Sequence, residues 1–259
     1  MKYLNRLIDE LLTWKWAIFF ILIFLFGRSQ RQHLLGSSVF IQAPFNQWDI
    51  LIGVTSDPFI LLYLVLPVVL LLSCLSIRRI WDMNWLIRVQ SWSKWVVYSA
   101  KIFIPTIVVS VSLLFIASIL LTAGMHYQAD WSSFSRADLS TFNYLSSFSW
   151  QSNLAPYVVL ILQMCLLIIY LLALHAAIAA GYLFFSNLFY LGSVSFIILL
   201  YNLLSFRYFF SFPKLIAFNY MTFPSSYGTY NAIYPPFLVL ALILIISIYV
   251  VPLLKKWRL

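Results

Sequence analysis

The sequence predicts an all-α, polytopic membrane protein with six transmembrane helices in a single transmembrane domain, residues 1–259. Hydrophobic residues make up 63% of the chain and charged residues only 9%, whereas soluble domains are about 45–50% apolar and about 25% charged. The apolar residues gather in runs of about 20, the length that crosses a bilayer core of about 30 Å. A soluble fold of this size would have no room to bury so much apolar surface, so the excess is expected to face lipid.

Six apolar runs are the expected spans. The first is short and contains Lys15, and the second carries no charge. The fourth and fifth share the uncharged stretch 154–206, which is too long for one crossing and too short for three. It therefore predicts two helices joined by a tight turn near 181–187. The expected spans are 11–27, 58–77, 102–123, 155–180, 186–206 and 235–254.

The start of the chain is amphipathic. Leu4, Leu7, Ile8, Leu11 and Leu12 follow a helical period, and the residues between them are largely polar. This pattern predicts an N-terminal interfacial helix that leads into the first span. The alternative is that these residues form the first turns of that span.

The distribution of positive charge predicts the orientation. With both termini in the cytoplasm, 11 of the 16 Lys and Arg residues lie on the inner side and the other 5 on the outer side, as the positive-inside rule requires. Both termini are therefore expected in the cytoplasm, in a multi-pass protein. The outer segments are then 28–57, 124–153 and 207–234. The last combines apolar residues with proline and glycine, and predicts short re-entrant helices before the final span.

The inner loop 78–101 is rich in tryptophan. Trp81, Trp85 and Trp92, together with two valines, recur at spacings of three or four residues and so share one face of a helix. Such a helix either lies in the lipid interface or docks into a groove on a partner, where Trp and Arg are favoured. The candidate contact residues are Trp81, Trp85, Arg88 and Trp92.

With this layout the chain resembles the permease subunit of a type-2 class ABC exporter. It is similar in particular to the small permeases of Gram-positive bacteriocin-immunity and antimicrobial-peptide export systems. The resemblance implies a bacterial plasma-membrane protein in which the loop 78–101 is a coupling helix resting on a separate ATPase subunit. It also implies a path formed with a second copy or a homologous permease, and a peptide or lipid-like substrate. The outer segment 124–153 is longer than in a minimal member.

Several motifs are absent from the sequence. It contains no G-x-x-x-x-G-K-[ST] phosphate loop, no H-E-x-x-H zinc motif and no G-x-S-x-G nucleophile elbow. The chain is therefore not expected to be an enzyme by itself or to hold a cofactor, and ATP and magnesium would belong to the partner subunit. Nucleic acid is not an expected partner, because the basic residues lie at the ends of apolar runs rather than on a solvated face.

Two other functions remain open. The same layout suits a stand-alone integral membrane immunity or sensor protein, which binds a peptide or a membrane partner without transport. A membrane enzyme is less favoured, and would require His33, His126 and Asp130 to meet at the outer face. None of the seven acidic residues lies centrally in an expected span, so an ion-coupled carrier or an intramembrane protease is not expected either.

A few residues inside the spans are candidates for specific roles. Gln163 and Asn202 are polar enough to line a substrate path, or to form hydrogen bonds between helices. Small residues at a spacing of four let two helices approach closely, either within the bundle or at a dimer seam. These residues are Ala173, Ala177 and Gly181. His175 lies in the fourth span and is either a functional or a packed structural residue.

Overall fold

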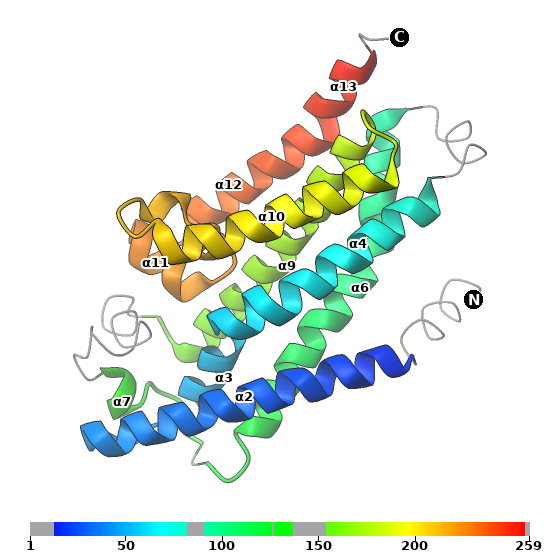
Figure 1. The fold of residues 1–259 in the computed structure, drawn as a ribbon. Coiled ribbons are helices and arrows are strands. Elements are labelled where there is room, and N and C mark those ends of the chain that lie inside the picture. Colours follow the sequence, from blue (N-terminus) through cyan, green and yellow to red (C-terminus); the bar gives the residue numbers. More distant parts are fainter. Residues whose placement is uncertain (1–12, 82–90, 126, 137–153, 257–259) are drawn as a thin grey trace.

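The computed structural model describes residues 13–81, 91–125, 127–136 and 154–256, and all regular secondary structure in these ranges is helical. Figure 1 shows a bundle of long helices, and five of its helical runs are long and apolar enough to cross a membrane. The all-α fold is thus confirmed, and the chain has the helices of a membrane protein. The five runs are Gln47–Ile80, Trp92–Leu121, Pro156–Tyr182, Phe189–Tyr208 and Tyr234–Lys255.

The first helix, α2 (Trp14–Ile41), is not among these five. Its apolar stretch lies between Lys15 and Arg28, and polar residues follow. The expected first span ends at residue 27, whereas α2 continues to Ile41, because no proline stops it before Gln42 and its two glycines do not end the helix. Gln42 adopts a left-handed conformation with φ 57° and ends the helix. The predicted interfacial helix falls mostly in residues 1–12, which lie outside the described ranges.

The second run begins earlier than the expected residue 58, because an additional short helix precedes it. This helix, α3 (Gln47–Thr55), starts at a capping box. The Asn46 side chain accepts a hydrogen bond from the Trp48 amide, and the Asp49 side chain accepts one from the Asn46 amide. The chain then breaks at residues 56–57 and continues as a π-helix and an α-helix. These are η1 (Ile60–Val65) and α4 (Leu66–Ile80).

Two π-turns among the described residues each lie just before a proline. The π-helix η1 ends two residues before Pro67, and η4 (Ile246–Val250) ends two residues before Pro252. Proline inside a helix lacks an N–H group and clashes with the carbonyl four residues earlier. A π-turn has hydrogen bonds that span five residues, and Leu66 N bonds to Leu61 O in this way just before Pro67.

The remaining long helices follow the expected order. The exception in length is α6, which begins ten residues before the expected start at residue 102 (102 − 92 = 10), so helix replaces the second half of the inner loop. A turn at residues 183–187 joins α9 to α10 in the predicted region. The helices are α6 (Trp92–Leu121), α9 (Pro156–Tyr182), α10 (Leu188–Tyr208), α12 (Tyr234–Ile245) and α13 (Val251–Lys256).

The two ends of the bundle differ. We call the end where α4 stops and α6 starts the tryptophan end, and Figure 1 shows that α2 begins and α13 ends there. The opposite end, which we call the hairpin end, carries short helices in the segment 207–234, where the sequence predicts them. These are η2 (Pro213–Leu215), η3 (Ala217–Tyr220) and α11 (Phe223–Tyr230), with α7 (Ser133–Arg136) nearby.

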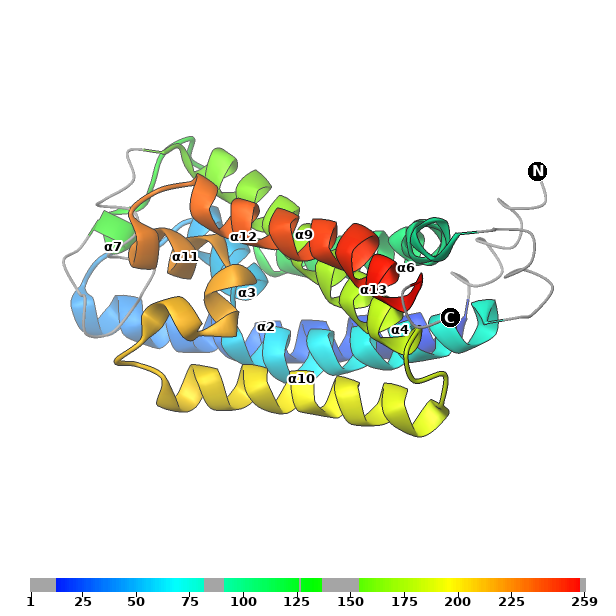
Figure 2. The ribbon, with the colours of Figure 1, turned by 90° about the horizontal axis from the view of Figure 1, so that it is seen from above.

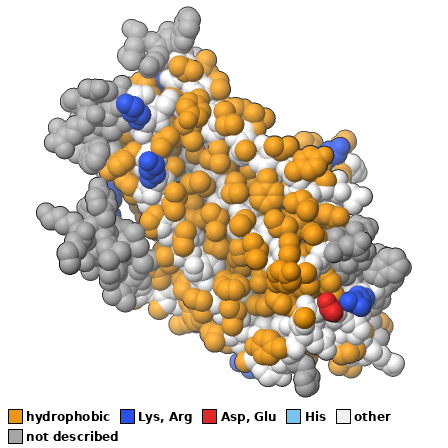
Figure 3. Space-filling model, turned by 180° about the vertical axis from the view of Figure 1, so that it is seen from behind, with side chains coloured by type: hydrophobic (Ala, Val, Ile, Leu, Met, Phe, Trp, Pro, Cys, Tyr) orange, Lys and Arg blue, Asp and Glu red, His pale blue; other side chains and the backbone are white. Residues whose placement is uncertain are grey.

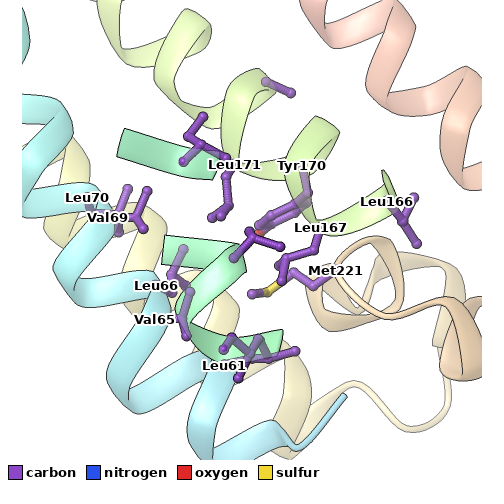
Figure 4. Packing of buried hydrophobic residues seen from close by; sticks show 14 of the residues in the cluster. Leu61, Val65, Leu66, Val69, Leu70, Leu166, Leu167, Tyr170, Leu171 and Met221 are labelled. Atoms are coloured by element: carbon purple, nitrogen blue, oxygen red, sulfur yellow. The ribbon is translucent and has the colours of Figure 1, made fainter. Parts of the chain in front are cut away.

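The core forms around α9, which packs against α3, α4, α6, α10, α11 and α12. Figure 4 shows Leu61, Val65 and Leu66 facing Leu167 and Leu171 of α9. All five side chains have no exposed surface. Truncating one buried leucine to alanine in such a core costs about 2–5 kcal/mol, so this contact orders the second run against α9.

The outer surface of the bundle is apolar. Figure 3 shows one face on which hydrophobic side chains cover the middle and Lys and Arg lie toward the margins. Figure 2 shows α10 at one edge of the bundle, where Phe189 and Phe196 are 80% and 63% exposed. Large apolar side chains exposed along whole helices are expected where the solvent is lipid.

Candidate functional site

The segment between α4 and α6, within the loop predicted to contact a partner, has a tryptophan at each end. Trp81 is the C-cap of α4 and Trp92 is the first residue of α6, and their rings stack at 6.4 Å between centroids with an interplanar angle of 14°. Trp81 also meets Trp95 edge-on at 5.1 Å and Tyr182 at 4.9 Å. We call Trp81, Trp92, Trp95 and Tyr182 the aromatic cluster. It closes the loop at its base, so the ends of the loop are fixed to α4, α6 and α9.

The four candidate contact residues do not share one environment. Trp85 and Arg88 lie in 82–90, outside the described ranges, so a coupling helix there stays a prediction. Trp81 and Trp92 are half-buried in the aromatic cluster, where they pack against the bundle rather than projecting from a single helix face. The periodicity of the sequence identified these tryptophans, but it does not distinguish a ring that meets a partner from one that packs on its own chain.

Trp95 was missed as a key residue, although among the described residues it is the largest fully buried side chain. Its ring lies under Trp81, and its Nε1 group has no hydrogen-bond partner within the described part of the chain. Its position three residues after Trp92, on the same face of α6, is the signal that predicts burial. An unpaired indole N–H makes this packing less favourable than the ring area alone suggests.

The Gln163 side chain forms hydrogen bonds that join α9 to the ends of α3 and α11 at the hairpin end. Its Nε2 group donates to Thr55 O at 3.1 Å and lies 3.4 Å from Met221 O, and its Oε1 atom accepts from Phe223 N at 2.6 Å. Thr55 is the last residue of α3, and Phe223 is the first of α11. Backbone groups at helix ends lack partners within their own helix. The fully buried Gln163 side chain supplies such partners to two helices.

Asn202 connects α10 to α9. The Tyr170 hydroxyl donates to Asn202 Oδ1 at 2.7 Å, and Asn202 Nδ2 donates to Ile198 O at 2.9 Å. Asn202 is only 1% exposed and Tyr170 is 5% exposed. The two residues predicted to line a path or join helices therefore both form interhelical hydrogen bonds, which is the second of the alternatives. Gln163 and Asn202 share no hydrogen-bond partner in the bonds described here.

His175 is a polar cross-link in the middle of the bundle. Ser73 Oγ of α4 lies 2.8 Å from its Nδ1 atom and Ser99 Oγ of α6 lies 3.0 Å from its Nε2 atom. The Phe103 ring stacks on the imidazole at 4.2 Å. Both ring nitrogens are thus engaged by hydroxyl groups, and the side chain is 1% exposed. This arrangement favours the structural alternative for His175; His126 lies outside the described ranges.

The small residues of α9 lie at its contacts with neighbouring helices. Ala173 is 1% exposed, while Ala177 and Gly181 are half-buried. A Cβ atom at Gly181 would lie 2.6 Å from the Tyr190 hydroxyl of α10, so glycine here permits the close approach of the two helices on either side of their turn. These contacts are within one chain, as in the bundle-packing alternative.

The sequence analysis did not anticipate a buried carboxylate at the hairpin end. Asp49 is 2% exposed, and besides its capping bond to Asn46 it accepts a hydrogen bond from the Ser135 hydroxyl of α7. Asp57 is 5% exposed and caps the next helix, with Oδ1 2.9 Å from Ile60 N. Both fall inside the run Gln47–Ile80, because the helix starts before residue 58. Acidic side chains are therefore buried near the hairpin end of this run, and neither lies at its centre.

Further hydrogen bonds hold residues 128 and 130, which follow α6, against the start of α3. The Gln47 side chain exchanges two bonds with the backbone of Gln128, and Trp48 Nε1 donates to Gln128 O at 2.7 Å. Asn46 Nδ2 donates to Asp130 O at 2.9 Å. These contacts close the hairpin end above α3. No sequence pattern links these two segments, because the partners are mostly backbone groups more than 80 residues away.

Replacing Asp49 by alanine is expected to lower the free energy of unfolding by about 1–3 kcal/mol, since the Asn46 amide and the Ser135 hydroxyl lose a buried acceptor. Unfolding in mixed micelles measures this change. Ser135→Ala alone is expected to cost less, because Asp49 keeps the Asn46 bond. The effect of the double variant should fall short of the sum of the two. If the two losses of unfolding free energy add fully, the contact between Asp49 and Ser135 does not contribute to stability.

The polar side chains described above form hydrogen bonds and packing contacts between helices. No group of three or more His, Cys, Asp or Glu side chains in the described ranges is arranged to hold a metal ion. Cys74 is engaged with Ser195 at 2.9 Å, and Cys165 is exposed. Comparisons of the chain with protein-family models, with curated proteins and with solved structures gave no match.

Proposed function

We propose that this chain is the membrane-spanning permease subunit of an ATP-driven exporter in a bacterial plasma membrane. The observation that carries the proposal is the anchored loop at the tryptophan end. The part of the loop between Trp81 and Trp92 is short in sequence. Its two end residues stack on each other, and Trp81 also packs on Tyr182 of α9. A force applied to the loop would therefore act on α4, α6 and α9 together, which is what a coupling element requires.

In this proposal the tryptophan end faces the cytoplasm. The count of 11 inner against 5 outer Lys and Arg residues supports this orientation, with both termini inside. The helix α2 acts as the first of six spans, and the short helices η2, η3 and α11 are the re-entrant segment. The sequence lacks a phosphate loop, so a separate ATPase subunit supplies ATP hydrolysis and binds the loop.

The substrate is proposed to be a hydrophobic or amphiphilic peptide, carried along a path formed with a second copy or a homologous permease. The exposed aromatic side chains at the hairpin end support an amphiphilic substrate. Phe210 and Phe212 are 73% and 65% exposed, and they lie beside Arg207 and Lys214. Aromatic and cationic side chains together suit a molecule with both apolar and polar parts.

The test is purification of the tagged chain from its native membrane, followed by measurement of ATP hydrolysis. A nucleotide-binding subunit is expected to copurify, and the double variant Trp85→Ala, Arg88→Ala is expected to reduce its recovery by at least tenfold. These two residues are chosen because Trp81 and Trp92 also hold the fold together. Trp14→Ala is the matched control, since Trp14 is 70% exposed at the same end.

Two outcomes would overturn the proposal. One is a fully active protein that has no energy-supplying companion, which would favour a stand-alone immunity or sensor protein. The other is labelling of a cysteine at position 85 only from outside the cell, which would reverse the orientation. In either case the loop would not be a coupling element.

A further inference from the structure

A lysine from the last helix reaches into the aromatic cluster. The Nζ atom of Lys255 lies 4.1 Å from the centroid of the Trp92 ring and 5.8 Å from that of the Trp81 ring. The same ammonium group donates a hydrogen bond to Leu183 O. Leu183 is the C-cap of α9. One side chain of α13 therefore contacts both ends of the inner loop and the end of α9.

Each of these contacts is favourable for a cation. The carbonyl groups at a helix C-terminus carry partial negative charge and lack partners within the helix, so an ammonium group there satisfies one of them. The indole face is the best aromatic partner for a cation within about 6 Å. Lys255 is half-buried, so water competes with these contacts less than it would at an exposed position.

We infer that Lys255 is a positioning residue that fastens the last helix to the inner loop and to the end of α9. Without it, the Leu183 carbonyl would lose a hydrogen-bond donor, and the stacked Trp81 and Trp92 would lose the cation that lies against both rings. Lys255 adds a polar link among the three elements to the aromatic contacts that already join the loop ends to α9, so that the last helix acts with them as one unit. Its effect on export rests on the proposed function, whereas its effect on the loop does not.

The first measurement does not depend on transport. In a background without Cys74 and Cys165, Ser91→Cys places a thiol at the N-cap of α6, beside Trp92. In the purified protein, Lys255→Met is expected to raise the rate of maleimide labelling at this thiol about fivefold to tenfold, because the closed base of the loop loses a cation–π contact and a hydrogen bond. Lys255→Arg keeps the charge and is expected to retain slow labelling.

The matched control is Lys101→Met, which removes an exposed lysine from the same helix as the thiol and should leave the labelling rate unchanged. The unfolding midpoint is measured for every variant, so that a folding defect is recognised. The inference is overturned if Lys255→Met and the parent protein label at the same rate while both are folded.

The second measurement separates this inference from the proposed function. In the assembled complex, Lys255→Met is expected to lower the number of substrate molecules exported per ATP hydrolysed, whereas a purely structural loss would lower both activities together. If no ATPase copurifies, the proposed function fails, but the labelling result still decides the role of Lys255. Unchanged export per ATP alongside faster labelling would overturn the claim that the three elements act as one unit in transport.

Discussion

Replacing Gln163 by methionine, which has a similar volume, is expected to destabilise the bundle by about 1–3 kcal/mol for each backbone group that loses its hydrogen bond. The change removes the bonds to Thr55 O and Phe223 N, and it leaves the Thr55 carbonyl in apolar surroundings. Because α3 and α11 are both held by this side chain, they are expected to open first. Unfolding in mixed micelles measures the loss of stability, and hydrogen exchange locates it.

The matched control is Gln32→Met, which alters the same residue type at an exposed position on α2 and is expected to change stability by less than about 0.5 kcal/mol. If Gln163→Met proves as stable as this control, the hydrogen bonds of Gln163 do not stabilise the bundle. The alternative role as a path residue would then regain weight, and it predicts altered transport in a fully stable protein.

Replacing Trp95 by alanine is expected to cost about 3–5 kcal/mol, the usual loss when a buried aromatic side chain is truncated. The ring has no exposed surface and supports Trp81 from below, so its removal should also loosen the base of the inner loop. Trp95→Phe is expected to cost clearly less, since it retains an aromatic ring and removes an N–H group that has no partner within the described ranges.

The measurement is again unfolding in mixed micelles, with Trp14→Ala as the exposed control. A loss for Trp95→Phe equal to that for Trp95→Ala would mean that the indole N–H is bonded, for example to a residue of the loop. A loss near that of Trp14→Ala for both variants would contradict the burial of Trp95.

The sequence was sufficient to predict the helical class and the order of the long helices, because those depend on the length and sequence of the apolar runs. Pro156 is the first residue of α9 and Asn187 caps α10, within two residues of the expected starts at 155 and 186. The start of α3 was not predicted, since Asn46 and Asp49 resemble ordinary loop residues until their capping bonds are seen.

The candidate site was only partly predictable. Periodicity identified Trp81 and Trp92, because spacing reports which residues share a helix face. It did not identify Lys255 or Ser135, whose partners lie far away in the sequence and are chosen by tertiary packing. The polarity of Gln163 showed that it needs partners, but a single sequence cannot tell whether these are backbone groups or a passing substrate.

The π-turn in η1 changes which side of the helix the later residues of the second run face. The buried positions Leu61, Val65, Val69, Ser73 and Ile77 are spaced by four residues, and a regular α-helix drifts by about 40° at each such step. Over four steps the buried positions would therefore rotate by about 160° around the helix axis. One extra residue in the π-turn corresponds to about 100° and offsets most of this rotation. The position of Ser73 opposite His175 therefore depends on the π-turn at Ile60–Val65, which begins more than ten residues earlier in the chain.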